Sequence, residues 1–342
     1  MMTNTTVSPE TTMTNAPMIR LLIPACLLMA LGACGESDLA DIRSDALAAA
    51  QQQGATINPV NSSNNGNTAL AATDGTVDSD SNTDTPAETV RSDVDVLLES
   101  HSLVFSDEFN AATLDAGKWN TAFQWGPDVV IMDELQYYVD TQEEPDFGYD
   151  PFMMTGNELV ITSVQTPPDL SADANGQPYL SGAMTSQGLF DFQRGYAEIR
   201  AKLPDGRGFW PGFWMLGTEF VDLKPQLYVM ENRGDNGSLV YHRYNYTNAD
   251  GEFIASDLYR TPGEDFINEF HTYGVQWTED AITWYVDGNA VQTLVDTQIP
   301  AQDMYLILNQ TVGGWLPEAP DETTEFPGEY VIDYVRVYQP VN

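Results

Sequence analysis

Cysteine and histidine are scarce in this chain of 342 residues. Its two cysteines, Cys26 and Cys34, both lie near the N-terminus. The remainder of the chain therefore has no disulfide framework, no thiolate metal site and no cysteine nucleophile. The three histidines, His101, His242 and His271, are widely spaced, which argues against a multi-histidine metal centre.

Basic residues are also few, with 13 Lys+Arg against 51 Asp+Glu and a formal net charge of −38. Such a charge repels phosphate groups, so we expect neither nucleic acid nor an anionic membrane surface as a partner. The acidity suits an uncharged ligand such as a neutral polysaccharide. It is equally typical of a solvated acidic surface with no ligand of its own.

The only long apolar run, LLIPACLLMALGAC (21–34), follows Arg20 and is too short to span a bilayer comfortably. It predicts a signal peptide over residues 1–34. Its last residues, Leu31 to Cys34, resemble a bacterial lipobox, which makes Cys34 the acylated first residue of a lipoprotein. Gly35 after Cys34 resembles lipoproteins that are sent to the outer membrane, so we expect an anchor there. An ordinary cleaved signal with incidental cysteines is the alternative.

Residues 35–97 are mostly Ala, Ser, Asn, Thr, Asp and Gln, with almost no aromatic side chains. Such a composition buries too little apolar surface to order a chain, so it predicts a disordered linker. We therefore expect three parts: the signal peptide, this linker, and one folded domain over residues 98–342.

Aromatic residues become dense after residue 100, and short segments alternate between polar and apolar residues, as in 196–203, 238–246 and 330–338. This period of two predicts β-strands. Asp287-Gly288, between two β-rich segments, predicts a hairpin, because both residues accept the positive φ of a tight turn. Many strands without alternating helices predict an all-β fold, a jelly-roll sandwich of the concanavalin-like type with a concave face.

Several segments together resemble glycoside hydrolase family 16, the laminarinase and lichenase group. They are GFWPGFWML (208–216), PQLYVMENRGDN (225–236), LVFSDEFN (103–110), DELQYY (133–138) and VIDYVRVY (331–338). The resemblance covers residues 100–340, and several matches in the family's order are more specific than a single motif.

Family members carry a Glu-x-Asp-x-x-Glu strand that holds the nucleophile, an assisting aspartate and the acid/base glutamate. The corresponding residues here are Gln226, Tyr228 and Glu231, so the resemblance implies that the acid/base position is kept and the other two are substituted. Residues 226 and 228 share a strand face by the period of two. Glu231 joins them only if a bulge lies near Val229 and Met230.

Retaining hydrolysis needs two carboxyl groups about 5–5.5 Å apart. Because Gln226 cannot serve as the anion, we expect a polysaccharide-binding protein without efficient turnover. The alternative is an active endo-glycosidase or transglycosidase that uses Glu231 with a non-standard second carboxylate. Candidates for that carboxylate are Glu219, Asp222, Asp235 and Glu252.

The resemblance also implies glycan contacts at Trp210, Trp214, Trp315, Glu134, Asn232 and Arg233, with Trp125 as a weaker candidate. Indole faces stack on pyranose rings, whereas Trp277 and Trp284 alternate within strands and are expected in the core. Glu108 and Asp333 resemble the family's structural calcium site, although two ordinary surface acids explain them equally well. No cofactor is required, and we expect a monomer.

Overall fold

The computed structural model describes residues 91–342, apart from residues 128, 220–224, 296–298, 300 and 342. The expected signal peptide, Cys34 and residues 35–90 of the expected linker lie outside the described residues. None of the helices in the described part is both long enough and apolar enough to cross a membrane.

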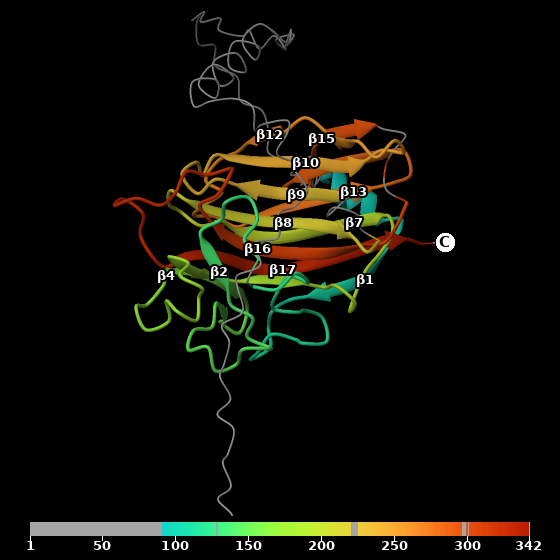
Figure 1. Cartoon of the computed structure of the whole chain (residues 1–342). Coiled ribbons are helices and arrows are strands. Elements are labelled where there is room, and N and C mark those ends of the chain that lie inside the picture. The colour runs from blue at the N-terminus through green and yellow to red at the C-terminus, as the bar shows by residue number, and fades with distance from the viewer. Residues whose placement is uncertain (1–90, 128, 220–224, 296–298, 300, 342) are drawn as a thin grey trace, which may run out of the picture. The chain divides into compact units, whose positions relative to one another are not determined.

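The described residues form two β-sheets, and Figure 1 shows β10, β9, β8 and β16 side by side in one of them. The ten-stranded sheet has the order β15-β14-β13-β7-β17-β4-β5-β2, with β1 beside β17 and β3 beside β4. The seven-stranded sheet has the order β11-β10-β9-β8-β16-β6, with β12 beside β10. All pairs are antiparallel except β2 with β5. The all-β sandwich expected from the alternating pattern is confirmed.

The ten-stranded sheet consists of β1 (His101–Asp107), β2 (Gln136–Tyr138), β3 (Phe152–Met154), β4 (Leu159–Gln165), β5 (Tyr179–Ser181), β7 (Gly195–Lys202), β13 (His271–Trp277), β14 (Ala281–Val286), β15 (Asn289–Val295) and β17 (Gly328–Pro340). The seven-stranded sheet consists of β6 (Ala183–Thr185), β8 (Phe209–Gly217), β9 (Gln226–Asn232), β10 (Leu239–Thr247), β11 (Phe253–Ala255), β12 (Tyr259–Pro262) and β16 (Met304–Val312). The expected strands at 196–203, 238–246 and 330–338 correspond to β7, β10 and β17.

The hairpin between β14 and β15 turns at Asp287 and Gly288, whose φ angles are 49° and 74°. Both angles are positive, as a tight hairpin turn with the twist of its strands requires. The turn that the Asp-Gly pair predicts is therefore present.

A short helix, α2 (Asp93–Leu98), precedes the first strand. It begins with a capping box, because Ser92 and Asp95 each accept a hydrogen bond from the other's backbone N–H. Val94 is buried in a cluster with Tyr196 and Tyr285 of the ten-stranded sheet. Residues 93–97, which the composition placed in the linker, therefore belong to the folded domain. The segment is ordered by one buried valine and a capping box. Composition did not reveal this, because the segment is otherwise polar.

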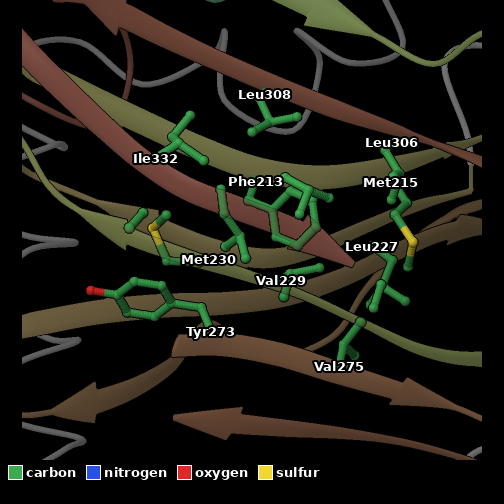
Figure 2. Packing of buried hydrophobic residues seen from close by; sticks show 14 of the residues in the cluster. Phe213, Met215, Leu227, Val229, Met230, Tyr273, Val275, Leu306, Leu308 and Ile332 are labelled. Carbon is green, nitrogen blue, oxygen red and sulfur yellow. The ribbon is translucent and has the colours of Figure 1, made fainter. Parts of the chain in front are cut away.

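The main hydrophobic core takes side chains from both sheets, and Figure 2 shows part of it. It includes Phe213 and Met215 from one sheet and Tyr273 and Val275 from the other. Burial of each such large side chain stabilises the fold by about 1.5–3 kcal/mol. Trp277 and Trp284, which alternation placed in the core, are 1% and 0% exposed.

Candidate functional site

Strand β9 contains the bulge that the spacing of Gln226, Tyr228 and Glu231 requires. On its β8 side, Tyr228 lies opposite Trp214 and Met230 lies opposite Phe213, so Val229 has no partner. The register also shifts on the β10 side, between the partners of Tyr228 and Glu231. One extra residue is therefore inserted in β9.

The bulge sends two consecutive side chains to the same side of the sheet. Val229 and Met230 are both 0% exposed, and Figure 2 shows them with Leu227 in the core. By the same alternation Gln226, Tyr228 and Glu231 lie on the opposite side. We call this side, which faces away from the ten-stranded sheet, the outer face.

Glu231 is nearly buried on the outer face, with 7% of its surface exposed. The indole Nε1 of Trp210 donates a hydrogen bond to its Oε1 at 2.9 Å. Burial raises the pKa of Glu231 to about 7, against the opposing effects of the Trp210 hydrogen bond and the Arg243 charge. Near neutral pH, a large fraction of Glu231 is therefore protonated and able to donate a proton.

Gln226 uses its amide oxygen within the protein. The hydroxyl of Tyr228 donates to Oε1 at 3.0 Å, and Nδ2 of Asn245 donates to the same atom at 3.1 Å. The amide Nε2 makes no hydrogen bond with another described residue. Position 226 therefore offers a hydrogen-bond donor and no negative charge.

An aromatic row extends across the outer face from Tyr228. Tyr228 stacks on Trp214 with ring centroids 5.5 Å apart, and Nε1 of Trp214 donates to Oδ1 of Asn309 at 2.8 Å. Phe123 lies 6.2 Å from Trp214 and stacks on Trp125 at 4.5 Å. Sequence reasoning missed Phe123, because its loop has no strand pattern. Trp125, the weaker candidate, is joined to the site through this ring.

Glu134 is also 7% exposed, and Nε2 of Gln136 donates to its Oε2 at 2.7 Å. Burial raises the pKa of Glu134 to about 8, although hydrogen bonds from Gln136 and Tyr138 oppose the rise. Tyr138 in turn accepts a hydrogen bond from Asn309 at 3.1 Å, so Glu134 connects to the residue that anchors Trp214. At neutral pH Glu134 is mainly protonated.

The other expected contacts differ in accessibility. Trp315 is 54% exposed. Arg233 forms an ion pair with Asp235 at 3.0 Å. Asn232, expected to reach a sugar hydroxyl, is instead 0% exposed, and its Nδ2 donates to the carbonyls of Asn236 and Leu239. It closes the turn after β9, because the bulge that turns Glu231 outward leaves the next residue facing inward.

The alternative carboxylates are not joined to Glu231 by any hydrogen bond among the described residues. Glu219 is exposed, and Asp235 is paired with Arg233. Glu252 accepts a hydrogen bond from Asn248 in the turn between β10 and β11. Asp222 lies outside the described residues.

The expected calcium ligands are each held by an arginine. Glu108 forms two hydrogen bonds with Arg336, at 2.9 and 2.7 Å, and Asp333 pairs with Arg200 at 2.5 Å. The described residues contain no group of three or more His, Cys, Asp or Glu side chains suited to a metal ion. Because a hard cation needs several converging oxygens, these side chains as placed do not fit a calcium site.

Sequence reasoning also missed three residues of β10 and one of β16. Tyr241, Arg243 and Asn245 share the outer face, since Tyr241 pairs with Glu231, Arg243 with Tyr228 and Asn245 with Gln226. The alternation in 238–246 places them on one side of a strand, but only the pairing shows which strand lies beside them. Nothing in the sequence around Asn309 indicated that it would lie at this site.

The two sheets and the outer-face carboxyl, amide and indole groups define a β-sandwich of the type found in carbohydrate-active proteins. The model of glycosyl hydrolases family 16 matches residues 133–336, and a model of the β-glucan synthesis-associated proteins SKN1/KRE6/Sbg1 matches residues 25–220. The endo-1,3-1,4-β-glycanase ExsH of Rhizobium meliloti is 34% identical over 250 residues, which cover 69% of this chain and 51% of that protein. This chain belongs to glycosyl hydrolases family 16.

Two further comparisons agree. A β-glucanase of Rhodothermus marinus is 30% identical over 262 residues, covering 69% of this chain and 85% of that protein. The crystal structure of SCLam, a non-specific endo-β-1,3(4)-glucanase, is 32% identical with a TM-score of 0.62 and covers 71% of this chain and 92% of that one. The jelly-roll fold is confirmed. The chain spans about half the length of the Rhizobium relatives that it matches.

Proposed function

We propose that this chain is a lipoprotein of the bacterial envelope whose family 16 domain binds a β-glucan or a related polysaccharide without efficient turnover. Cys34 anchors it to the outer membrane, and residues 35–90 tether the domain. Glucanases among its relatives support the ligand class. A glutamate-to-serine variant of SCLam was co-crystallised with an oligosaccharide and presents 1,3-β-D-cellobiosyl-glucose at its active site.

Gln226 is the observation that carries the proposal. It occupies the position of the family's nucleophile, and Tyr228 occupies that of the assisting aspartate. A retaining glycosidase forms a bond between a carboxylate and the anomeric carbon, and an amide is a poor substitute. The Oε1 atom of Gln226 is moreover occupied by two donors. Glu231 remains as the acid/base residue without the anion that its chemistry requires.

A binding role accounts for the remaining groups on the face. Trp315, which follows β16, is 54% exposed and offers an indole surface, whereas Trp210 and Trp214 expose only 6% and 7% of theirs. Glu134 supplies a hydrogen-bonding carboxyl that is 7% exposed. Arg233 lies past the end of β9, where it pairs with Asp235, and is the remaining expected contact. Stacking of sugars on such rings needs no catalytic carboxylate.

An active endo-glycosidase or transglycosidase is the second candidate, and the pKa of Glu231 favours it. Burial raises that pKa to about 7 against the opposing Trp210 hydrogen bond and Arg243 charge, so Glu231 is suited to protonate a leaving group without a carboxylate neighbour. A second buried carboxyl, Glu134, has a pKa raised to about 8 and is mainly protonated at neutral pH. It is a weak nucleophile or base there, which places binding ahead of hydrolysis.

Product release separates the two functions. The full chain and its Glu231→Gln variant are incubated with laminarin, mixed-linkage glucan, agarose and carrageenan, and released oligosaccharides are measured by mass spectrometry. We expect no release by either protein, together with retardation of the wild type in affinity gels containing one of the glycans. Release by the wild type that Glu231→Gln abolishes would refute the binding role and require a second carboxylate.

Anchoring has its own test. In cells, the wild type should incorporate labelled palmitate and fractionate with the outer membrane, whereas Cys34→Ala should do neither. Equal labelling of the two proteins would overturn the assignment of Cys34.

A further inference from the structure

Two arginines of the seven-stranded sheet form no ion pair within 4.0 Å with any acidic side chain that the structure describes. The chain carries 51 Asp+Glu against 13 Lys+Arg, so most cations have a carboxylate close by. Among the described residues, six other arginines form ion pairs within 4.0 Å: Arg91, Arg194, Arg200, Arg207, Arg233 and Arg336. Arg243 and Arg260 form neither an ion pair nor a hydrogen bond with any described residue.

Strand register places both arginines on the outer face. Arg243 on β10 lies opposite Tyr228 on β9. Arg260 on β12 lies opposite Tyr241, which itself lies opposite Glu231. Directly paired residues share a face, and so do residues two apart on one strand. The two arginines therefore lie on strands to one side of β9, and Trp214 lies on β8, to its other side.

Arg243 is held close to the proposed binding residues. Its positive charge lowers the pKa of Glu231 against the effect of burial, which requires proximity. Its Nε is buried and has no hydrogen-bond partner. An unsatisfied buried N–H of a charged group is costly unless a ligand completes it. Arg260 is exposed and adds a second cation. It lies diagonally across from Arg243, because its partner Tyr241 is two residues before Arg243 on β10.

Farther along β10, the outer face carries an exposed apolar side chain. Thr247, on the same side of β10 as Arg243, lies opposite Phe253 of β11. The Phe253 ring is 47% exposed. Thr247 is four residues from Arg243 and six from Tyr241, the partner of Arg260, so this ring suits another sugar residue of the same polysaccharide chain. A guanidinium suits a sugar residue that carries a negative substituent, because it receives the anion.

We propose that the polysaccharide bound on this face carries an anionic substituent, a sulfate ester or a carboxylate, which Arg243 and Arg260 recognise. This inference rests on the proposed function, since it assigns the substituent to the same ligand. Guanidinium groups bind both kinds of oxyanion in a bidentate manner, whereas asparagine or glutamine would serve for neutral hydroxyls. The overall acidity does not prevent such binding, because charges beyond about 8 Å are largely screened at 0.15 M salt.

Three laminarins that share one polysaccharide chain and differ only in their substituents test the inference. Affinity gels contain neutral laminarin, sulfated laminarin or carboxymethylated laminarin, and the full chain is compared with Arg243→Gln, Arg260→Gln and the double variant. Arg91→Gln, which removes the same charge from an exposed ion pair near helix α2, is the control. Far-ultraviolet circular dichroism verifies that each variant is folded.

We expect the wild type to bind at least one anionic laminarin about tenfold or more tightly than the neutral glycan, as loss of a charge-assisted hydrogen bond implies. Each variant of Arg243 or Arg260 should lose most of that preference, and Arg91→Gln should keep it. Preference for the sulfated or the carboxymethylated glycan identifies the substituent.

Two results would overturn the inference. One is equal binding of neutral and anionic laminarin by the wild type, which leaves the proposed function intact. The other is an anionic preference that the double variant retains. If no glycan of any charge is bound, the proposed function fails together with the inference, so the two failures are distinguishable.

Discussion

Nδ1 of His242 lies 2.6 Å from the carbonyl oxygen of Val229, the extra residue of the β9 bulge. The carbonyl accepts, so Nδ1 carries the proton, and Nε2 accepts from the hydroxyl of Thr261 at 2.9 Å. Burial lowers the pKa of His242 to about 4, which keeps the ring neutral and this arrangement fixed. His242 thus supports, from the core side, the bulge that turns Glu231 to the outer face.

Replacement of His242 by alanine should disturb both the fold and the site. The change removes the partner of a buried carbonyl and leaves a cavity, so we expect the free energy of unfolding to fall by about 2–4 kcal/mol. Because the bulge positions Glu231, glycan affinity at a temperature where the variant is folded should fall as well. Urea unfolding and affinity gels measure the two effects.

His101→Ala is the matched control for this substitution. Nδ1 of His101 also contacts a backbone carbonyl, that of Leu97 at 2.8 Å, but it lies at the start of β1. We expect a smaller loss of stability and unchanged glycan binding. If His242→Ala binds glycan as tightly as the wild type, the bulge does not depend on this ring.

Ionisation of Glu231 should make the protein less stable as pH rises. Its pKa is raised from 4.5 to about 7 in the folded state, so the unfolded chain ionises first as pH increases. The contribution of Glu231 to the free energy of unfolding is complete below pH 4.5. It falls as the pH rises from 4.5 to 7 and levels off above pH 7, for a total loss of about 3 kcal/mol. Glu231→Gln lacks this loss, so its stability relative to the wild type should rise by that amount between pH 4 and pH 8.

Urea unfolding at several pH values tests this dependence, with Glu329→Gln as the control. Glu329 is an exposed side chain on β17. Its substitution should leave the pH profile parallel to that of the wild type. A parallel profile for Glu231→Gln too would mean that Glu231 is solvated.

The sequence predicted the fold well because alternation and the Asp-Gly turn are local properties. It also predicted that Gln226, Tyr228 and Glu231 share a face, since their spacing permits this only with a bulge. Asn232 was placed wrongly, because the same bulge reverses the direction of every residue that follows it. Arg243, Arg260 and Asn309 depend on which strands become neighbours, and a single strand's pattern does not contain that information.

Trp315 should contribute to glycan binding without contributing to stability. Its side chain is 54% exposed, so alanine there leaves no cavity, and the free energy of unfolding should change by less than about 0.5 kcal/mol. Loss of a stacking ring should weaken binding by about tenfold. Leu189→Ala, at a side chain 42% exposed, is the control and should alter neither quantity. Unchanged affinity of Trp315→Ala would remove this residue from the site.

Chelation should not destabilise the domain. Arg336 and Arg200 already neutralise Glu108 and Asp333, so there is no cluster of free carboxylates among the described residues for calcium to join. We expect the same Tm in excess EDTA and in millimolar calcium chloride, measured by differential scanning fluorimetry. A rise in Tm with calcium would show that backbone carbonyls or other ligands complete a site that these two side chains alone do not.

Restoring a carboxylate at position 226 should create hydrolysis if Gln226 is the reason for its absence. Glutamate has the shape of glutamine, and the donors that now reach Oε1, from Tyr228 and Asn245, would stabilise its negative charge. The new anion would also raise the pKa of Glu231 further through like-charge repulsion. Gln226→Glu should therefore release oligosaccharides from a glycan that the wild type only binds, and Tyr228→Asp in addition should increase the rate.

Two further variants isolate the cause of any gain. Gln226→Leu alters the same side chain without adding a charge and should stay inactive, and Gln226→Glu combined with Glu231→Gln should lose the gained activity. Tyr228→Asp also removes the stacked partner of Trp214, so the double variant is compared at equal folded fraction. If Gln226→Glu binds glycan normally but releases nothing, positions 226 and 231 are not separated as a retaining pair requires, and the outer face is adapted for binding beyond the loss of one charge.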